Sequence, residues 1–430
     1  SDHQPVKQGF AVRVGDQTRT LDSNGFKEIR FLGQYPIGTV SYDDADSPVS
    51  AQLEAFSPFI PLNTDDSSLP ATVVNISLTN KTDQSLEAEL TGFLENAVLH
   101  DHRNSAAAVL RNHTVRDRVM AAVVSHAEVP RSLPQPRPDI VFEAFESDEY
   151  EGWQVEGTAF ADGPISITDI PAYQGDVNGE DTRVVNSHNV RRGGDVAAGD
   201  RHVGRMTSKP FEIERPFINF LIGGGNHSGK TCLNLLIDGK VILSATGHNH
   251  NRMLGESFNV SNWIGRQAQL QIVDQASGPW GNIGIDHIVF SDTPRSTESI
   301  DKMPDFGTLA LAIVDPQPDD RALASLATTV EATDEATAPL GSSLIGGLKR
   351  RLRLKPGETA TATFVIAWHF PNLKLNALGG TGRWYASKFS SAREVAAYVA
   401  ANVQRLTSTT RLWRDTWYDS TLPYWLLNRT

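Results

Sequence analysis

The sequence predicts a mainly β protein, in which one β-sandwich carries a second β-sandwich inserted into it and a C-terminal α-helix follows. Two observations favour this fold class. Short runs of strand-forming residues follow one another from about residue 9, and turn residues rather than helical segments separate them. Within the runs two sets of residues alternate, as at 71–80, where Val74, Ile76 and Leu78 alternate with the largely polar set Val73, Asn75, Ser77 and Thr79. Many closely spaced strands without intervening helices indicate packed antiparallel sheets.

The composition of the 430-residue chain is that of a globular protein with apolar material for more than one core. Acidic residues outnumber basic ones by 51 to 39, and the net charge of −12 argues against nucleic acid and anionic membrane surfaces as partners. The single cysteine, Cys232, leaves no intramolecular disulfide. No run approaches the ~20 apolar residues of a transmembrane helix. We expect a soluble protein with no transmembrane segment; its localisation stays open, an exported bacterial protein being one option.

Two breaks divide the chain into an outer and an inner part. The first, at 129–139, is rich in proline, and the second lies in the polar stretch 291–305. Strand-like runs resume at 306–315 and 359–370, so the first domain continues beyond the second break. An inserted domain needs its two ends close together, which a sandwich allows. We predict a host β-sandwich over 1–135 and 296–390, an inserted module over 139–293, and a helix with a junction over 391–430.

One long helix is predicted after residue 390. Four apolar residues recur at three- and four-residue spacing between Val395 and Leu406. Ser390 or Ser391 is placed to cap the N-terminus, and Glu394 stands in the first turn.

A glycine-rich segment at 224–231 matches the pattern of a phosphate-binding loop. Such a loop must open a helix whose N-terminal amides hold the phosphate. In this chain the segment leads instead into the run CLNLLI and then Asp238-Gly239, a pair typical of a hairpin turn. We therefore interpret the segment as strand, turn and strand, without a nucleotide site.

Carboxylates and histidines nominate no catalytic or zinc site by spacing alone. A glycosidase needs two carboxylates that flank the sugar. Glu54, Glu95 and Asp101 lie in strand or loop contexts where surface or turn-capping roles are expected, so we name no catalytic residue. The histidine pairs at 100–102 and 248–250 lack a third ligand at zinc spacing, and we expect solvated loop histidines there.

The middle segment holds two candidate sites. Glu143 in its first strand and Asp286 in its last could supply oxygen ligands to a structural Ca²⁺ that joins the two ends of the module. The alternative is a pair of solvated or turn-bonded carboxylates. Trp153 and Trp280 are candidates for stacking on a sugar ring, whose C–H face suits an aromatic plane, against the ordinary role of tryptophan in core packing. No further cofactor is required.

Four long segments match one known family in order. They are GQYPIGTVSYDDADSPVSAQLEAFSPFIPLNTDDSSLP at 33–70, DFGTLALAIVD at 305–315, AWHFPN at 367–372 and WRDTWYDSTLPYWLLNR at 413–429. The chain resembles the N-terminal β-sandwich domain of the non-lysosomal glucosylceramidase and β-glucosidase family, glycoside hydrolase family 116. The resemblance implies that retaining β-glycosidase chemistry belongs to a following (α/α)₆ barrel, absent from this chain. It carries over no catalytic residue, and the family's glycine-rich opening segment is missing.

The middle segment has a resemblance of its own. FEAFESDEYEGWQVEGTAF, INFLIGGGNHSGKTCLNLLIDGKVI and IVDQASGPWGNIGIDHIVFSD are similar to the jelly-roll modules attached to bacterial levanases and other β-fructosidases. The two resemblances together imply a non-catalytic N-terminal portion of a retaining β-glycosidase, inactive alone. Its partners would be the (α/α)₆ catalytic domain and, through the whole enzyme, a carbohydrate or glycolipid-type substrate. A stand-alone carbohydrate-binding protein acting through the inserted module and a structural spacer are the alternatives.

Overall fold

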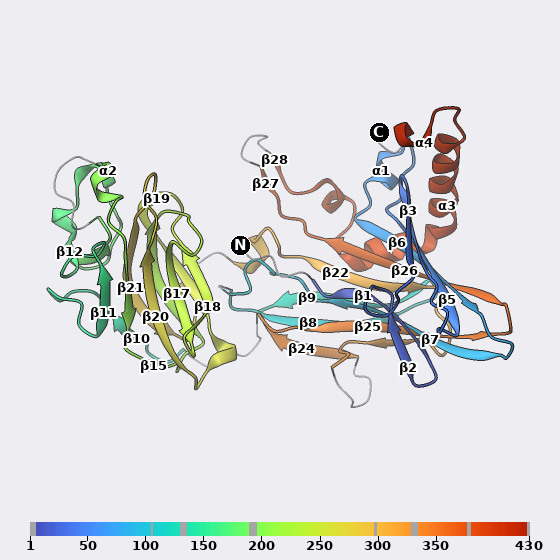
Figure 1. Ribbon diagram of the computed structural model, residues 1–430, viewed down its shortest axis with the longest axis horizontal. Coiled ribbons are helices and arrows are strands. Elements are labelled where there is room, and N and C mark those ends of the chain that lie inside the picture. Colours follow the sequence, from blue (N-terminus) through green and yellow to red (C-terminus); the bar gives the residue numbers. More distant parts are fainter. Residues whose placement is uncertain are drawn as a thin grey trace.

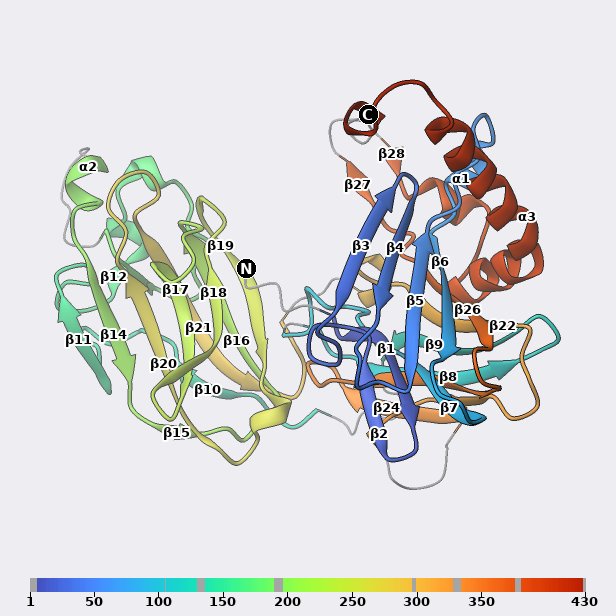
Figure 2. The same cartoon turned by 45° about the vertical axis from the view of Figure 1, so that its right-hand side comes forward.

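The computed structural model describes residues 6–104, 106–129, 136–188, 196–295, 299–327, 334–375 and 380–427. Two β-rich bodies lie side by side, one built from residues 140–291 and the other from the strands before and after them (Figures 1 and 2). Strand pairs in the described part of the chain are antiparallel. The predicted mainly β fold with a C-terminal helix is confirmed.

The larger body contains a five-stranded and a nine-stranded sheet. The first has the order β2-β1-β7-β25-β23, with β1 (Gln8–Val14), β2 (Gln17–Thr20), β7 (Leu86–Glu95), β23 (Arg321–Leu323) and β25 (Ile345–Leu354). The second has the order β24-β8-β9-β22-β26-β6-β5-β4-β3, with β3 (Ile29–Gln34), β4 (Ile37–Tyr42), β5 (Val49–Phe56), β6 (Ala71–Asn80), β8 (Val109–Arg116), β9 (Met120–Glu128), β22 (Thr308–Val314), β24 (Glu335–Pro339) and β26 (Thr359–His369).

Side-chain alternation explains why these two sheets pack face to face. Every second residue of a strand points to the same side, so the apolar set of β6 meets the apolar sets of β1, β7 and β25 in one core. Phe10 on β1 contacts Phe364 on β26 across that core, with ring centroids 5.1 Å apart. Burying one such side chain stabilises the fold by about 1.5–3 kcal/mol. One face of the nine-stranded sheet therefore lies in this core, and the opposite face is left for other partners.

The strands on either side of the middle segment are neighbours in the nine-stranded sheet. β9 pairs with β22 in a register that joins His126 to Thr308 and Met120 to Val314. The chain thus leaves the sheet after β9 and re-enters it beside the same strand, as an insertion requires. Within the smaller body, Ile140 pairs with Phe290, so its first and last strands are neighbours too. The predicted domain boundaries remain predictions, and residues 130–135 and 296–298 of the two predicted breaks lie outside the described residues.

The smaller body consists of two six-stranded sheets that share one core. One sheet contains β10 (Ile140–Glu143), β12 (Ile165–Ser166), β13 (Arg183–Asn186), β16 (Phe217–Gly224), β19 (His250–Asn259) and β21 (Ile283–Ser291). The other contains β11 (Trp153–Gly157), β14 (Gly204–Ser208), β15 (Phe211–Glu212), β17 (Thr231–Ile237), β18 (Lys240–Thr246) and β20 (Gln267–Asp274). The segment that resembles a phosphate-binding loop joins β16 to β17, and β18 follows, so it opens a strand and not a helix, as predicted.

The long helix α3 (Ala392–Tyr418) packs on the free face of the nine-stranded sheet (Figure 2). Its cap is the predicted one: the Ser391 side chain accepts from the backbone N–H of Glu394, and the Glu394 carboxylate accepts from that of Ser390 at 2.8 Å. The two bonds satisfy backbone N–H groups at the start of the helix, one from Glu394 and one from Ser390, the residue before the N-cap. Val395 and Val399 lie buried against Val73 and Val365 of the sheet, which fixes the first half of the helix.

Short elements complete the fold. They are α1 (Thr64–Ser67), α2 (Val196–Gly199), α4 (Tyr424–Leu427), the 3₁₀ turns at Ile167–Asp169, Ala172–Gln174, Ser261–Trp263, Ile300–Lys302 and Trp384–Ser387, and the two-residue strands β27 (Lys374–Leu375) and β28 (Gly380–Thr381). None of the described helices combines the length and the apolar character that a membrane span requires.

Candidate functional site

The free face of the nine-stranded sheet changes character along its strands. On β6 the residues that face α3 are Ala71 and Val73 and then Asn75, Ser77 and Thr79, because side chains two positions apart share a face. On β26 the apolar residues Ala367 and Val365 are followed on the same face by threonines, at 363, 361 and 359. On β5 the apolar Phe56 is followed on the same face by the polar residues Glu54, Gln52 and Ser50. The first half of α3 thus covers an apolar surface and its second half a polar one.

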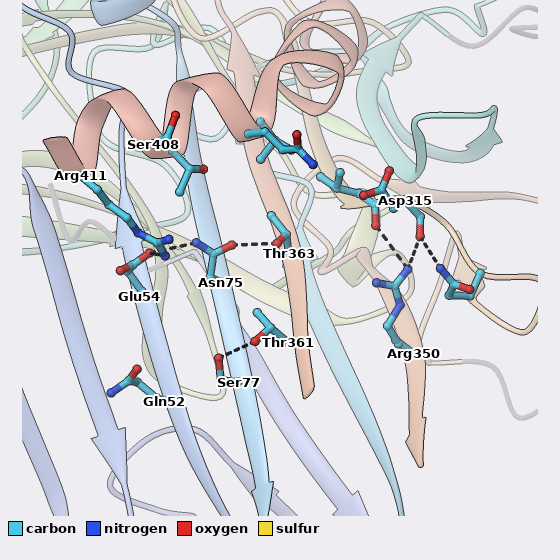
Figure 3. A pocket seen from close by; sticks show the side chains of 15 residues that line it. Gln52, Glu54, Asn75, Ser77, Asp315, Arg350, Thr361, Thr363, Ser408 and Arg411 are labelled. Carbon is cyan, nitrogen blue, oxygen red and sulfur yellow. Dashed lines mark hydrogen bonds and ion pairs between the residues drawn. The ribbon is translucent and has the colours of Figure 1, made fainter. Parts of the chain in front are cut away.

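A hollow of about 650 Å³ lies between this polar surface and the second half of α3 (Figure 3). Hydroxyl, amide and charged side chains dominate its wall. The lining residues are Gln52, Glu54, Asn75, Ser77, Val314, Asp315, Gln317, Arg350, Thr361, Thr363, Val403, Gln404, Thr407, Ser408 and Arg411. Its volume falls within the roughly 300–1,000 Å³ of small-molecule sites in proteins. We call it the α3 hollow.

A hydrogen-bonded row crosses the floor of the α3 hollow. Arg411 on α3 donates to Oε1 of Glu54 at 2.5 Å, and the Asn75 amide donates to the same oxygen at 3.0 Å. Thr363 in turn donates to Oδ1 of Asn75 at 2.8 Å. The strand register makes this row, since Glu54 pairs with Asn75 and Asn75 with Thr363. Two residues further along the strands, the hydroxyls of Ser77 and Thr361 lie 2.8 Å apart (Figure 3).

The far end of the α3 hollow is held by a buried ion pair. Arg350 on β25 donates to both carboxylate oxygens of Asp320, at 2.9 and 2.5 Å, and to the carbonyl of Asp315 at 2.9 Å. A bidentate pair of this kind is rigid and directional. Arg350 and Asp320 are both buried, so this wall is preformed and keeps its shape without a ligand.

The carboxylates of the α3 hollow do not form the pair that glycoside hydrolysis uses. Glu54 and Asp315 lie toward opposite ends, with the Asn75–Thr363 row between them (Figure 3). Glu54 is engaged by Arg411, and the Arg414 guanidinium lies 3.9 Å from its second oxygen. An acid or nucleophile needs freedom to reach the sugar. The wall is therefore equipped to hydrogen-bond a ligand rather than to cleave one.

The four residues predicted in the middle segment do not gather into one site. Glu143 accepts from the backbone N–H of Phe145 at 2.8 Å and from the indole of Trp153 at 3.1 Å. The Trp153 ring packs against Phe145, 5.7 Å away, and is half-buried. Glu143, predicted to bind calcium, and Trp153, predicted to stack on a sugar, are thus hydrogen-bonded to each other where Trp153 packs against the core of the smaller body.

Asp286 is fully buried in the adjoining strand. Its two oxygens accept from the backbone N–H groups of Glu180 and His287, at 2.7 and 2.8 Å, and burial raises the pKa of its carboxyl to about 7. No group of three or more His, Cys, Asp and Glu side chains suited to a metal ion occurs among the described residues. The calcium site stays a prediction.

Trp280 is placed differently from Trp153. It lies in a turn with a positive φ of 59°, and 39% of its surface is exposed.

The two histidine pairs contain ion-paired members: His102 lies 2.7 Å from Asp305, and His248 lies 2.6 Å from Glu256. These contacts account for two histidines of the loops without a metal.

An ion pair at the ends of the middle segment escaped the sequence prediction. Arg137 donates to both oxygens of Asp292, at 2.9 and 2.6 Å, and this bond lowers the pKa of the Asp292 carboxyl to about 2. The α3 hollow escaped it as well, although the change from Ala71 and Val73 to Asn75 and Ser77 is visible in the sequence. What the pattern lacked was the position of α3 above those residues.

Comparison with known proteins shows the family over two ranges of the chain. Residues 7–174 and 319–406 match the family described as beta-glucosidase 2, glycosyl-hydrolase family 116 N-term. A curated protein of Aspergillus rugulosus, named "Putative glycosyl hydrolase ecdE", is 34% identical over 175 residues, which are 40% of this chain and 24% of that protein. The match therefore spans about a quarter of the length of that relative.

Solved structures offer only weak likenesses. The C-terminal extracellular domain of Mycobacterium tuberculosis EmbC is 15% identical, with a TM-score of 0.23 over 59% of this chain and 96% of that one. The CBM22-1-CBM22-2 tandem domain of Paenibacillus barcinonensis Xyn10C is 9% identical, with a TM-score of 0.18 over 55% and 91%. Such TM-scores are far below those of a shared overall fold, so they support no role. The family match is different in kind: it covers more than half of the chain, and the protein belongs to glycosyl-hydrolase family 116 through its N-terminal domain.

Proposed function

We propose that this chain is the non-catalytic N-terminal portion of a retaining β-glycosidase of β-glucosidase or glucosylceramidase type, which supports the (α/α)₆ catalytic domain of the whole protein. The observation that carries the proposal is the family match on both sides of the middle segment, over strands of both sheets of the larger body. The whole enzyme would hydrolyse a β-glycoside, either a carbohydrate or a glycolipid. The chemistry would require two carboxylates outside this chain.

The state of the carboxyl groups supports a non-catalytic role. A glycosidase acid needs a raised pKa inside a cleft that admits the sugar. The described carboxyls with a raised pKa are Glu256, Asp274 and Asp286, and burial is the main cause for each. All three belong to the smaller body, and none lines the α3 hollow. None of these three carboxyl groups with a raised pKa therefore lies in the wall of the α3 hollow.

The exposed edge of the nine-stranded sheet supports the docking of another domain. β3 is the last strand in that sheet and carries Ile29, Phe31 and Leu32 on the surface, with Phe31 73% exposed. An unpaired edge with exposed apolar side chains pairs readily with other chains unless something covers it. The turn after β3 adds Tyr35, 58% exposed, whose ring lies 5.4 Å from Phe59.

Further aromatic residues continue this surface to the end of α3. Phe59 contacts Trp413 on α3, and Trp425 on α4 is 65% exposed. The β3–β4 hairpin stands beside α4 and the end of α3 in both views (Figures 1 and 2). Exposed apolar side chains gathered in one region of this kind mark an interaction surface. We infer that the catalytic domain covers it.

The substitution Phe31→Lys tests this docking in two settings. In the isolated 430-residue chain it removes exposed apolar surface, so we expect the free energy of unfolding to stay within about 0.5 kcal/mol of the parent. In the whole protein it places a charge in the domain interface, and we expect a lower Tm and lower β-glycosidase activity. Val241→Lys, on an exposed position of β18 in the smaller body, is the control. An unchanged Tm and activity of the Phe31→Lys whole protein would contradict the proposed docking.

A second candidate function is sugar binding by the inserted module, and the exposure of Trp280 favours it. A half-exposed indole in a turn can stack on a pyranose ring. Isothermal titration of the chain with β-glucosides, β-glucans and fructans is the test, with Trp280→Ala as the variant. Binding that Trp280→Ala abolishes would support this role, and no binding to any of these sugars would favour a structural spacer.

Thermal melts with and without Ca²⁺, compared with Glu143→Gln, test the calcium prediction in the same module.

A further inference from the structure

We propose that the α3 hollow is a binding site for a neutral saccharide of one or a few sugar units. The inference is independent of the proposed function, because the wall of the hollow lies wholly within this chain and binding requires no catalytic domain. It is also separate from sugar stacking at Trp280, which belongs to the smaller body. Three properties of the wall carry the inference: its unused hydrogen-bonding groups, the pairing of its guanidinium groups with carboxylates, and the small share of apolar side chains in its lining.

The wall offers hydrogen-bonding groups that the protein does not use. The described hydrogen bonds leave the side chains of Gln52, Gln404 and Thr407 without a protein partner, and all three line the hollow. Gln52 stands on the sheet floor, and Gln404 and Thr407 stand on the helix above it. Amides and hydroxyls on opposing walls can each donate and accept, which matches the hydroxyls of a sugar.

The groups that are already bonded are held in fixed positions. Asn75 is fixed by Glu54 and Thr363, and the Ser77 hydroxyl lies 2.8 Å from that of Thr361. An amide or hydroxyl fixed by one bond keeps further donor and acceptor capacity for a ligand. A ligand that meets preordered groups loses less free energy to ordering them, which favours binding.

Both guanidinium groups of the wall are paired with carboxylates, and the Asp315 carboxylate adds a negative charge for which the described ion pairs give no cation. Arg411 is neutralised by Glu54, and Arg350 by Asp320. A phosphate or carboxylate ligand needs unpaired cationic groups, whereas here each of these two guanidinium groups already has its carboxylate. The charge pattern therefore favours a neutral ligand over an anionic one.

Few apolar side chains line the hollow. Among the described residues that line it, Val314 and Val403 are aliphatic and none is aromatic. A lipid tail or a flat aromatic ligand needs an apolar wall. A polar, neutral and multiply hydroxylated ligand fits the wall, and saccharides are the chemical class with those properties.

Two substitutions in the wall and one just outside it test the proposal. Thr361→Val removes a hydroxyl from the floor, and Gln404→Leu removes an amide from the helix. Thr359→Val is the matched control: it lies two residues away on the same face of β26, forms the same kind of hydroxyl pair, with Thr79 at 2.8 Å, and does not line the hollow. All three are made in the full chain carrying Trp280→Ala, so that the smaller body does not contribute.

Isothermal titration with methyl β-glucoside, cellobiose and laminaribiose, and with inorganic phosphate as the anionic probe, gives the readout. We expect saturable binding of at least one neutral sugar, a Kd raised about tenfold (~1.4 kcal/mol) by Thr361→Val and by Gln404→Leu, and no change from Thr359→Val. Absence of saturable binding of all three sugars would overturn the proposal. So would sugar binding that both wall substitutions leave unchanged, or binding of phosphate alone.

Discussion

The carboxylate of Asp66 accepts a hydrogen bond of 2.6 Å from the guanidinium of Arg405, which joins the short helix α1 to the middle of α3. Asp66 is buried, with 3% of its surface exposed, and also accepts from Tyr398 at 2.9 Å and from Asn63 at 2.7 Å. The bond from Arg405 is the main cause that lowers the pKa of Asp66 below its ordinary value. This cluster holds α3 on the sheet at the turn from which Val403, Gln404 and Thr407 line the α3 hollow.

We predict that Asp66→Asn lowers the free energy of unfolding by about 1–2 kcal/mol at pH 7, a range reduced because Arg405 is partly exposed. The amide cannot accept as many hydrogen bonds as the buried carboxylate. Urea unfolding measures the difference. Asp65→Asn is the control, since Asp65 is exposed and its partner Lys388 is 3.5 Å away, and we expect less than about 0.5 kcal/mol from it. Equal effects of the two substitutions would count against the role of the cluster.

The stabilisation from Asp66 should also depend on pH in a defined direction. Its folded pKa is lowered, so the stabilisation is present above the unfolded pKa of about 3.9 and is lost as the pH falls through the folded value. We expect the difference between the parent and Asp66→Asn to be constant from pH 6 to 8 and to shrink below pH ~4. Urea unfolding across this range is the measurement, and a difference that grows on acidification would show that another group dominates.

Asp274 of the smaller body should behave in the opposite way. It is fully buried, its Oδ1 accepts a long hydrogen bond of 3.4 Å from the backbone N–H of Ala276, and no described residue donates to its Oδ2. Burial raises the pKa of its carboxyl to about 7. A raised folded pKa gives stability that is complete below the unfolded pKa of about 3.9 and is lost as the pH rises toward 7. Asp274→Asn should therefore stabilise the chain by about 1–3 kcal/mol at pH 8 and leave it unchanged at pH 4.

The contrast with Asp286 makes the Asp274 prediction specific. Both oxygens of Asp286 accept from backbone N–H groups, so an amide there would lose an acceptor. Burial raises the pKa of Asp286 to about 7 as well, so at pH 4 its neutral acid resembles the amide and we expect little change from Asp286→Asn. At pH 8 we expect Asp286→Asn to stabilise the chain less than Asp274→Asn does, because the amide loses one of the two acceptors of the ionised carboxylate. Differential scanning calorimetry at both pH values compares the two variants. Destabilisation by Asp274→Asn at pH 8 would show that its carboxylate has a partner when ionised.

The two tryptophans proposed for sugar binding should differ in their effect on stability. Trp153 packs on Phe142 and Phe145 and donates to Glu143, so we expect Trp153→Ala to cost about 2–4 kcal/mol. Trp280 lies half-exposed in a turn, and Trp280→Ala should cost less than about 1 kcal/mol. Guanidinium unfolding measures both. A large loss for Trp280→Ala would assign it to packing and weaken the case for sugar stacking.

Short sequence patterns predicted the helix cap, the strand alternation and a hairpin of this chain. Ser391 and Glu394 stand three residues apart, so the serine N-cap can be recognised from the sequence, and so can the strand alternation from Val74 to Leu78. Asp238-Gly239 predicted the hairpin between β17 and β18 for the same reason. In each case the interacting groups are sequence neighbours, and short-range geometry alone decides the outcome.

The candidate site could not be predicted in this way, because its contacts join distant residues. Glu54 and Arg411 are 357 positions apart, and Asn75 and Thr363 are 288 apart. Their contact depends on strand order and on where α3 crosses the sheet, which alternation does not encode. Glu143 and Asp286 show the same limit: their strands are neighbours as expected, but their oxygens face backbone N–H groups and an indole that the sequence did not reveal.

The central claim is that this chain supports a β-glycosidase without being one, and the hydrolysis of an aryl β-glucoside tests it most directly. The measurement is the initial rate of aglycone release by the purified 430-residue chain and by the whole protein at equal concentration. We expect no rate above the buffer blank for the chain and clear turnover by the whole protein. Turnover by the chain alone that survives repurification and is abolished by Glu54→Gln would contradict the account and assign catalysis to the α3 hollow.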